Sequence, residues 1–339
     1  MARGLAGKAV GLIRESLSVS IRLFRIMIPV AVGVKILSET GAIARIGEFL
    51  SPVMRLVGLP GGMGLVWATA MTTNLYGGIV TFVSLAPGER LSTADVTVLT
   101  TMMLVAHSLP VELGVARQAG ARIRFMLPLR VVGAFVLGAM LSALFDSAGL
   151  LQDEAVILWR PSPETPGFMP WVLGQVRNLV SIFVIVTALM ALLRILRRTG
   201  VTALIDRGLR PVLVSMGIGP SASTVTIFGM ILGLSYGGGL IIGGVRSGSI
   251  PPRDVFFSLC LMGLAHSVVE DTLLMLSLGA SAWGVLVARL LFAWGVVALL
   301  VRLIRSMPDR LFYRWFYTSP ASAGASLPDS SPDSPPDVR

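Results

Sequence analysis

The two histidines of this chain stand in the same motif, Ala-His-Ser, which occurs once in each half of the sequence. Each copy combines an imidazole, a hydroxyl and, within one or two helical turns, at least one carboxylate. The residues are His107, Ser108 and Glu112 in the first half, and His266, Ser267, Glu270 and Asp271 in the second. Imidazoles and carboxylates carry protons or bind cations. Because ionisable groups in apolar helices are costly and commonly functional, we predict that these side chains bind a proton or another cation. The alternative is a buried polar lock between the two halves.

A second pair of candidate sites surrounds a repeated Tyr-Gly-Gly motif in two glycine-rich apolar stretches. Glycine costs a helix about 1 kcal/mol relative to alanine, so each stretch is expected to break. The backbone groups freed there need partners, and helix ends offer partial charges to a substrate. The predicted substrate-binding residues are Thr73, Asn74, Tyr76 and Gly77 in the first stretch, and Ser235, Tyr236 and Gly237 in the second. The alternative is close helix packing, because Gly229, Gly233 and Gly237 have GxxxG spacing.

These motifs belong to a longer internal repeat. Thr40-Gly41 returns as Thr199-Gly200, and Pro52-Val53 returns as Pro211-Val212, in the same order as the tyrosine and histidine motifs. The repeat predicts two copies of one structural unit. In an apolar chain, paired units are typical of membrane transporters.

The composition places the chain in a membrane. Hydrophobic residues make up 54% of the sequence and charged residues 14%, whereas a soluble domain has about a quarter of its residues charged. The net charge is +10. The arginines cluster at the ends of apolar segments, as in the positive-inside pattern, so the lipid bilayer and not nucleic acid is the expected partner.

Enzyme motifs are absent from the sequence. There is no Gly-x-x-x-x-Gly-Lys-[Ser/Thr] phosphate loop, no His-Glu-x-x-His and no Gly-x-Ser-x-Gly. We therefore expect no enzyme, no catalytic residue and no cofactor. The single cysteine, Cys260, supports no thiolate cluster, and the sequence leaves a metal site open.

We divide the chain into five parts. They are an amphipathic N-terminal segment (1–22), a first repeat (23–148), a periplasmic linker (149–171), a second repeat (172–317) and a disordered tail (318–339). Each repeat contains the same predicted elements: an apolar helix, an amphipathic helix, the glycine-rich stretch, a helix carrying Ala-His-Ser and a last apolar helix. The Ala-His-Ser helices are predicted over 93–117 and 253–278, and Pro110 is expected to weaken the first of them locally.

The charge pattern favours an inverted arrangement of the two repeats. If the glycine-rich stretch crosses the membrane once, each repeat has four crossings and the arginine-rich loop 117–130 lies outside. If the stretch enters and returns as a re-entrant hairpin, each repeat has three crossings, the second repeat is inverted and that loop lies inside. We therefore predict an all-α integral membrane protein of two inverted-topology repeats, each with about three transmembrane helices, an amphipathic helix and a re-entrant helical hairpin. Eight plain crossings are the alternative.

In the order of these parts, the chain resembles the nucleoside-recognition, or Gate, domain family. The similarity covers an apolar helix ending in Thr-Gly, an amphipathic helix, Pro-Val, a glycine-rich hairpin and a polar-marked helix, in both repeats. That family includes the spore maturation proteins A and B and the gate segments of ferrous-iron transporters, with concentrative nucleoside transporters more distant. The resemblance implies a transport-type protein with paired gates, but it implies no particular solute. Tyr76 and Tyr236 stand where iron gates tend to carry cysteine.

The resulting hypothesis is a multi-pass permease of the bacterial inner membrane with both termini in the cytoplasm. It would move a small polar solute, nucleoside-like in one version, by ion-coupled alternating access. The alternatives are a divalent metal cation transporter using His107, Glu112, His266 and Glu270, and a non-transporting scaffold or complex subunit. The sequence is compatible with a homo-oligomer. It does not determine the solute, the coupling ion, the direction of transport or the oligomeric state.

Overall fold

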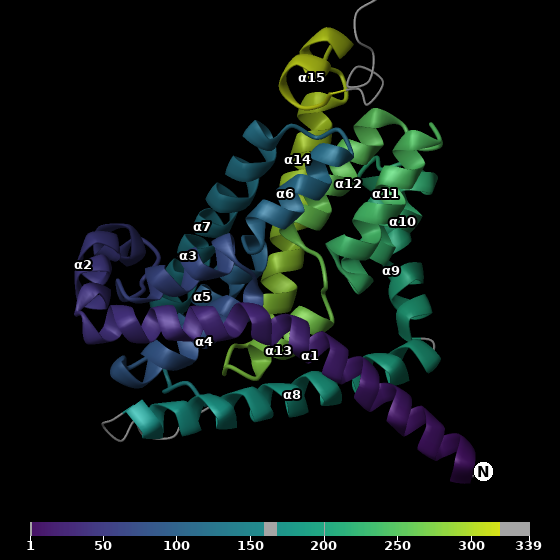
Figure 1. Cartoon of the computed structure of the whole chain (residues 1–339). Helices are drawn as coiled ribbons and strands as arrows, with labels where there is room; N and C mark the ends of the chain where they lie inside the picture. The colour runs from purple at the N-terminus through teal and green to yellow at the C-terminus, as the bar shows by residue number, and fades with distance from the viewer. Residues whose placement is uncertain (1, 159–167, 200, 319–339) are drawn as a thin grey trace, which may run out of the picture.

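The computed structural model describes residues 2–158, 168–199 and 201–318 (Figure 1). Within these ranges all regular secondary structure is helical, as predicted. The predicted disordered tail lies outside the described residues from residue 319 onward, and so does the central part of the linker.

The elements of the first repeat follow the predicted order. They are α1 (Ala2–Glu39), α2 (Ala42–Arg55), α3 (Met63–Thr72), α4 (Leu75–Leu85), the short η1 (Ala86–Gly88), α5 (Thr93–Val105), α6 (Leu109–Gln118) and α7 (Ile123–Ala148). Residues 2–22 continue without a break into the apolar part of α1, so they form no separate element. Their position on a membrane surface stays a prediction.

The second repeat has the same order of elements. They are α8 (Phe168–Arg198), α9 (Val201–Ser215), α10 (Pro220–Leu232), α11 (Leu234–Arg246), α12 (Pro252–Leu264), α13 (Glu270–Leu276), the π-helical η2 (Trp283–Ala288) and α14 (Arg289–Ile304). A further helix, α15 (Asp309–Trp315), follows.

Several helices are long and apolar enough to cross a membrane. Within the described residues there are three: Thr93–Gln118, Ile123–Ala148 and Trp283–Ile304. A fourth results if Met27–Glu39 and Ala42–Arg55, which meet at a bend of 93°, count as one span. Most of α7 and α14 is not covered by other helices, and large apolar side chains lie exposed along both. Such faces suggest a lipid environment. In Figure 1, α1 and α8 run across the bundle rather than along α7 and α14.

The two glycine-rich stretches form helical hairpins. In the first hairpin, α3 and α4 pack closely because Gly78 lies against Ala70. In the second, α10 and α11 approach so closely that a Cβ on Gly237 would lie 2.4 Å from the Gly229 Cα atom. The arms of the first hairpin have 10 and 11 residues, thus about 15 Å each, half of a hydrocarbon core of about 30 Å. A re-entrant path through a membrane stays a prediction.

The helices α5 and α12, which lead to the two Ala-His-Ser motifs, run in opposite directions. The start of α5 lies beside the chain that follows α7, because Thr93 N donates to Asp153 O at 2.8 Å. The chain that follows α13 lies at this same end, because Ser281 N donates to Thr97 Oγ1 at 2.8 Å. At the opposite end, the start of α12 contacts the end of α14, where Arg253 donates to Arg305 O at 3.0 Å. Thus α5 leads away from the end at which α13 finishes, while α12 leads toward it (Figure 1).

The prediction of a single helix through each Ala-His-Ser motif is wrong in both repeats. Ala106 and Ala265 end α5 and α12, and the following serines, Ser108 and Ser267, adopt φ angles of +48° and +47°. This left-handed conformation is uncommon outside glycine. Pro110, in the first turn of α6, marks the break in the first repeat, whereas the second repeat has neither glycine nor proline within three residues of Ser267. The half-helices α6 and α13 begin only after it.

Candidate functional site

Four helix breaks converge where the repeats meet. Each hairpin is tied to the broken helix of its own repeat by one backbone hydrogen bond: Ser108 N donates to Ala70 O at 2.9 Å, and Val268 N donates to Met230 O at 2.8 Å. The second hairpin also packs across the repeat boundary, where α11 contacts α6. The breaks therefore bring helix ends from both repeats to one buried region.

The two imidazoles meet at the centre of this region. The ring centroids of His107 and His266 lie 5.0 Å apart, and both side chains are buried. His107 Nδ1 lies 2.9 Å from Met103 O, and His266 Nδ1 lies 2.8 Å from Met262 O. A carbonyl oxygen only accepts, so both Nδ1 atoms carry a hydrogen and both Nε2 atoms remain for the centre.

The carboxylates around the imidazoles are Glu112 and Asp271. Glu112 Oε1 lies 3.4 Å from His107 Nε2 and 3.2 Å from His266 Nε2. A carboxylate oxygen of Asp271 lies within 4.8 Å of ring nitrogens of both histidines. Of the two predicted carboxylates of the second repeat, Glu270 is only half-buried and is not part of this group. The counterpart of Glu112 is Asp271, because it occupies the first turn of α13 as Glu112 occupies the first turn of α6.

Two buried arginines complete the centre. Arg130 and Arg289 are each 1% exposed, and each stands 23 residues after the histidine of its repeat. Arg130 donates to Val105 O and His107 O, and Arg289 donates to Leu264 O and His266 O. The guanidinium groups thus bind carbonyls at the C-terminal ends of α5 and α12, where the helix dipole favours a cation.

The sequence prediction for Arg130 is wrong: the arginine-rich loop 117–130 was expected to contain it, yet it lies in α7 and pairs with Glu112. Arg289 lies in the last apolar helix, as expected, and interacts with Asp271 through its charge. The signal that identifies the pair is the constant spacing from the histidines, together with an arginine inside an otherwise apolar run.

The hairpin tip of the first repeat reaches the same region. Asn74 Oδ1 accepts a hydrogen bond from Gly77 N at 2.9 Å and so caps α4, and Thr73 Oγ1 donates to Thr69 O at 2.7 Å. Tyr76 lies within electrostatic range of Glu270 and Asp271 of the other repeat. The Thr73 hydroxyl and the Asn74 side-chain oxygen therefore stabilise the hairpin itself.

The tip of the second hairpin is only partly described. Gly237 packs against Gly229, as the alternative of close helix packing predicts. Gly233, at the break, faces the Ser267 hydroxyl. The side chains of Ser235 and Tyr236 lie outside the described residues.

Three hydrogen-bond acceptors lie together between the imidazoles. Each Nε2 accepts when its ring is neutral, and Glu112 Oε1, at 3.4 Å and 3.2 Å from the two Nε2 atoms, also accepts. Such a group is stable only with a proton or another cation between its members. The arrangement can therefore bind a positive charge at the boundary between the repeats.

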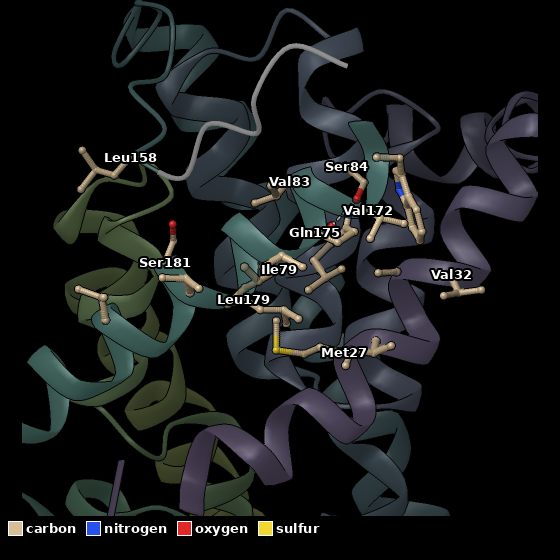
Figure 2. A pocket seen from close by; sticks show the side chains of 17 residues that line it. Met27, Val32, Ile79, Val83, Ser84, Leu158, Val172, Gln175, Leu179 and Ser181 are labelled. Carbon is tan, nitrogen blue, oxygen red and sulfur yellow. Dashed lines mark hydrogen bonds between the residues drawn. The ribbon is translucent and has the colours of Figure 1, made fainter. Parts of the chain in front are cut away.

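Two cavities lie away from this centre. Figure 2 shows an apolar pocket of about 550 Å³ between α1, α4 and α8, where Met27, Ile79 and Leu179 are among the lining residues. A second cavity, of about 1010 Å³, lies at the arginine-rich end, where α6, α7 and α11 approach the chain after α15. Its basic lining residues are Arg117, Arg122, Arg124 and Arg246.

Much of the first repeat matches a known sequence family. Residues 20–122 match the Gate family, described as nucleoside recognition. The predicted resemblance is confirmed for this segment. The Gate segment contains the first hairpin, His107 and Glu112, and it ends at the start of α7.

A membrane protein from Bacillus subtilis (strain 168) is similar over both repeats. The uncharacterized membrane protein YvoD is 27% identical over 270 residues, which cover 79% of this chain and 85% of the relative. No solved structure matches. The Gate segment and this relative support a membrane protein whose first repeat is similar to the Gate family.

Proposed function

We propose that this protein is an ion-coupled permease of the bacterial inner membrane, with its transport site at the boundary between two inverted repeats. The observation that carries the proposal is the convergence of four helix breaks on one buried group of two imidazoles, two carboxylates and two guanidinium groups. Discontinuous helices that meet between repeats are the usual site architecture of secondary transporters. The opposite directions of α5 and α12 support the inverted arrangement.

The positions of the charges support an orientation in the membrane. Arginines of both repeats gather at the end where α6 finishes and α12 begins, including Arg117, Arg246 and Arg253. Asp153 and Glu154 lie at the other end, beside the start of α5. By the positive-inside rule, the arginine end and the chain after α15 are cytoplasmic. The N-terminal end lies on the α8 side, away from α15, in Figure 1. With this orientation, its position does not support the cytoplasmic N-terminus expected from the sequence.

The acceptor-rich centre supports coupling to a cation. A cation held by Nε2 of His107, Nε2 of His266 and Glu112 Oε1 contacts both repeats at once, and so its binding differs between states in which the repeats separate. A change in conformation requires this differential affinity. The solute is a small polar molecule, and its contacts involve the region around Tyr76.

Flux measurements in proteoliposomes test the proposal. The purified protein is screened with nucleosides, organic ions and metal ions under imposed proton and ion gradients. We expect gradient-dependent uptake. The His107→Gln, His266→Gln double variant should reduce this uptake at least roughly tenfold, because glutamine replaces each imidazole and removes its Nε2 acceptor from the centre. The surface variant Gln118→Ala is the matched control and retains uptake. If no compound moves faster than in empty liposomes under any gradient, the permease proposal fails and a scaffold role is favoured.

A further inference from the structure

We propose that His107, His266 and Asp271 bind a divalent transition-metal ion at the boundary between the repeats. One atom from each side chain lies within 4.8 Å of the other two, and all three residues are buried. The inference names the class of ion for the centre described above. It rests on the proposed function for the movement of that ion, while binding itself depends only on the ligands.

The imidazoles are oriented as metal ligands are. In each ring, Nδ1–H donates to a backbone carbonyl one helical turn earlier, Met103 O or Met262 O. A bond of this kind fixes the tautomer and turns the Nε2 lone pair toward the metal in known metal sites. Because both repeats supply the same arrangement, two nitrogen donors face one point.

Asp271 supplies an oxygen donor that has no hydrogen bond. Its side chain is 8% exposed, and among the described residues no hydrogen bond reaches Oδ2. Arg289, the counterpart of Arg130, donates to the carbonyls of Leu264 and His266 and interacts with Asp271 only through its charge. A buried carboxylate oxygen of this kind needs a cationic partner. A metal ion between the two Nε2 atoms provides it.

Glu112 supplies a fourth donor atom to the proposed site. Metal–ligand distances of about 2.0–2.2 Å place the ligand atoms of a tetrahedral site roughly 3.4 Å apart. Glu112 Oε1 lies 3.4 Å and 3.2 Å from the two Nε2 atoms, which matches this spacing. A shift of about 1 Å brings the Asp271 oxygen, now within 4.8 Å, to the same spacing.

The donor atoms select the type of metal. Two imidazole nitrogens with carboxylate oxygens suit zinc, iron(II), cobalt or nickel, whereas calcium and magnesium prefer oxygen ligands alone. A thiolate is not part of the group, because the Cys260 sulfur lies against Met126 Sδ at 3.9 Å. The site is thus a nitrogen–oxygen site.

The charges that face the site set its dependence on pH. Arg130 and Arg289 lie beside it, and Tyr76, Glu270 and the ligands themselves are the titratable groups. Both imidazoles must be neutral to bind a metal, so binding releases protons and weakens as the pH falls.

Equilibrium dialysis with cobalt(II) ions alone tests the inference on the detergent-purified full chain. We expect one tightly bound ion per chain and visible absorption bands of nitrogen–oxygen coordination without a thiolate charge-transfer band. Asp271→Asn, and the double variant His107→Gln, His266→Gln, should each lower the affinity at least about 100-fold. Asp271→Glu, which keeps the carboxylate, should retain binding. Glu89→Gln, an exposed carboxylate change, is the matched control.

Three results would overturn the metal site. They are no bound cobalt in the wild-type protein, an absorption spectrum with thiolate ligation, and unchanged affinity in the folded ligand variants. If the Asp271→Asn variant does not fold, the spectrum of the wild-type protein and the affinity of the Asp271→Glu variant still test the metal site. Binding that is intact in a protein without any flux counts against the permease proposal and not against the site.

Discussion

At the scale of single residues, the buried group of histidines, carboxylates and arginines differs between the two repeats at one position. Glu112 and Asp271 occupy the same place, but the longer side chain of Glu112 reaches Arg130 and both imidazoles, whereas Asp271 Oδ2 has no hydrogen bond among the described residues. The additional methylene group of Glu112 thus lets one carboxylate both neutralise a buried guanidinium and face the imidazoles, whereas Asp271 forms no such ion pair among the described residues.

This difference predicts unequal costs of removing the two carboxylates. Glu112→Gln leaves the buried Arg130 without its ion-pair partner and should destabilise the protein by roughly 3–5 kcal/mol. Asp271→Asn leaves Arg289 with its carbonyl partners and should cost at most about 1 kcal/mol. Unfolding of both variants in detergent measures the difference, and the double variant Glu112→Gln, Arg130→Gln should recover part of the loss. Equal destabilisation by both single variants would contradict the assignment of the ion pair.

At the scale of elements, two kinds of helix break differ in how visible they are in sequence. The first hairpin turns at Asn74 and the second at Gly233. Both turns lie in glycine-rich stretches, and the low helix propensity of glycine predicts them from the sequence. The breaks at Ser108 and Ser267 place serine in the left-handed region, at a cost of order 1–3 kcal/mol that the surroundings must offset. Near the break, Ser108 N donates to Ala70 O of the neighbouring hairpin, a contact distant in sequence.

Glycine at the hairpin crossing predicts a position-specific effect of alanine. Gly237→Ala places a methyl group against the backbone of Gly229, which cannot yield, and should destabilise the protein by about 1–3 kcal/mol. Gly243→Ala on the same helix α11 meets no atom within 4 Å and should stabilise by up to about 1 kcal/mol through helix propensity. Thermal unfolding of the two variants checks the pair. A stabilising Gly237→Ala would mean that α10 and α11 do not pack at this point.

At the scale of the whole molecule, the antiparallel placement of α5 and α12 separates the charges. Arginines of both repeats lie at one end, and Asp153 and Glu154 lie at the other. Both repeats contribute to the arginine end, because α6 of the first repeat finishes there and α12 of the second repeat begins there.

Cysteine labelling predicts which side each end faces. In a Cys260→Ala background, Gln152→Cys should react with a membrane-impermeant maleimide in intact cells. Gln118→Cys and Ser249→Cys should react only after the cells are opened. All three positions are exposed, whereas Ser92 caps α5 and is a poorer choice. Labelling of Gln118→Cys from outside would refute the orientation, and labelling of all three from one side would refute the inverted arrangement.

The sequence by itself determined the features that depend on composition and local propensity. Its hydropathy predicted the helical membrane-protein class, its glycines predicted the hairpins, and the repeated motifs predicted that His107 and His266 are equivalent. The tertiary structure alone decided which partners these residues have. The pairing of Glu112 with Arg130, the place of Asp271 rather than Glu270 beside the histidines and the breaks at Ser108 and Ser267 all depend on contacts between segments far apart in the chain. Local periodicity carries no information about such contacts.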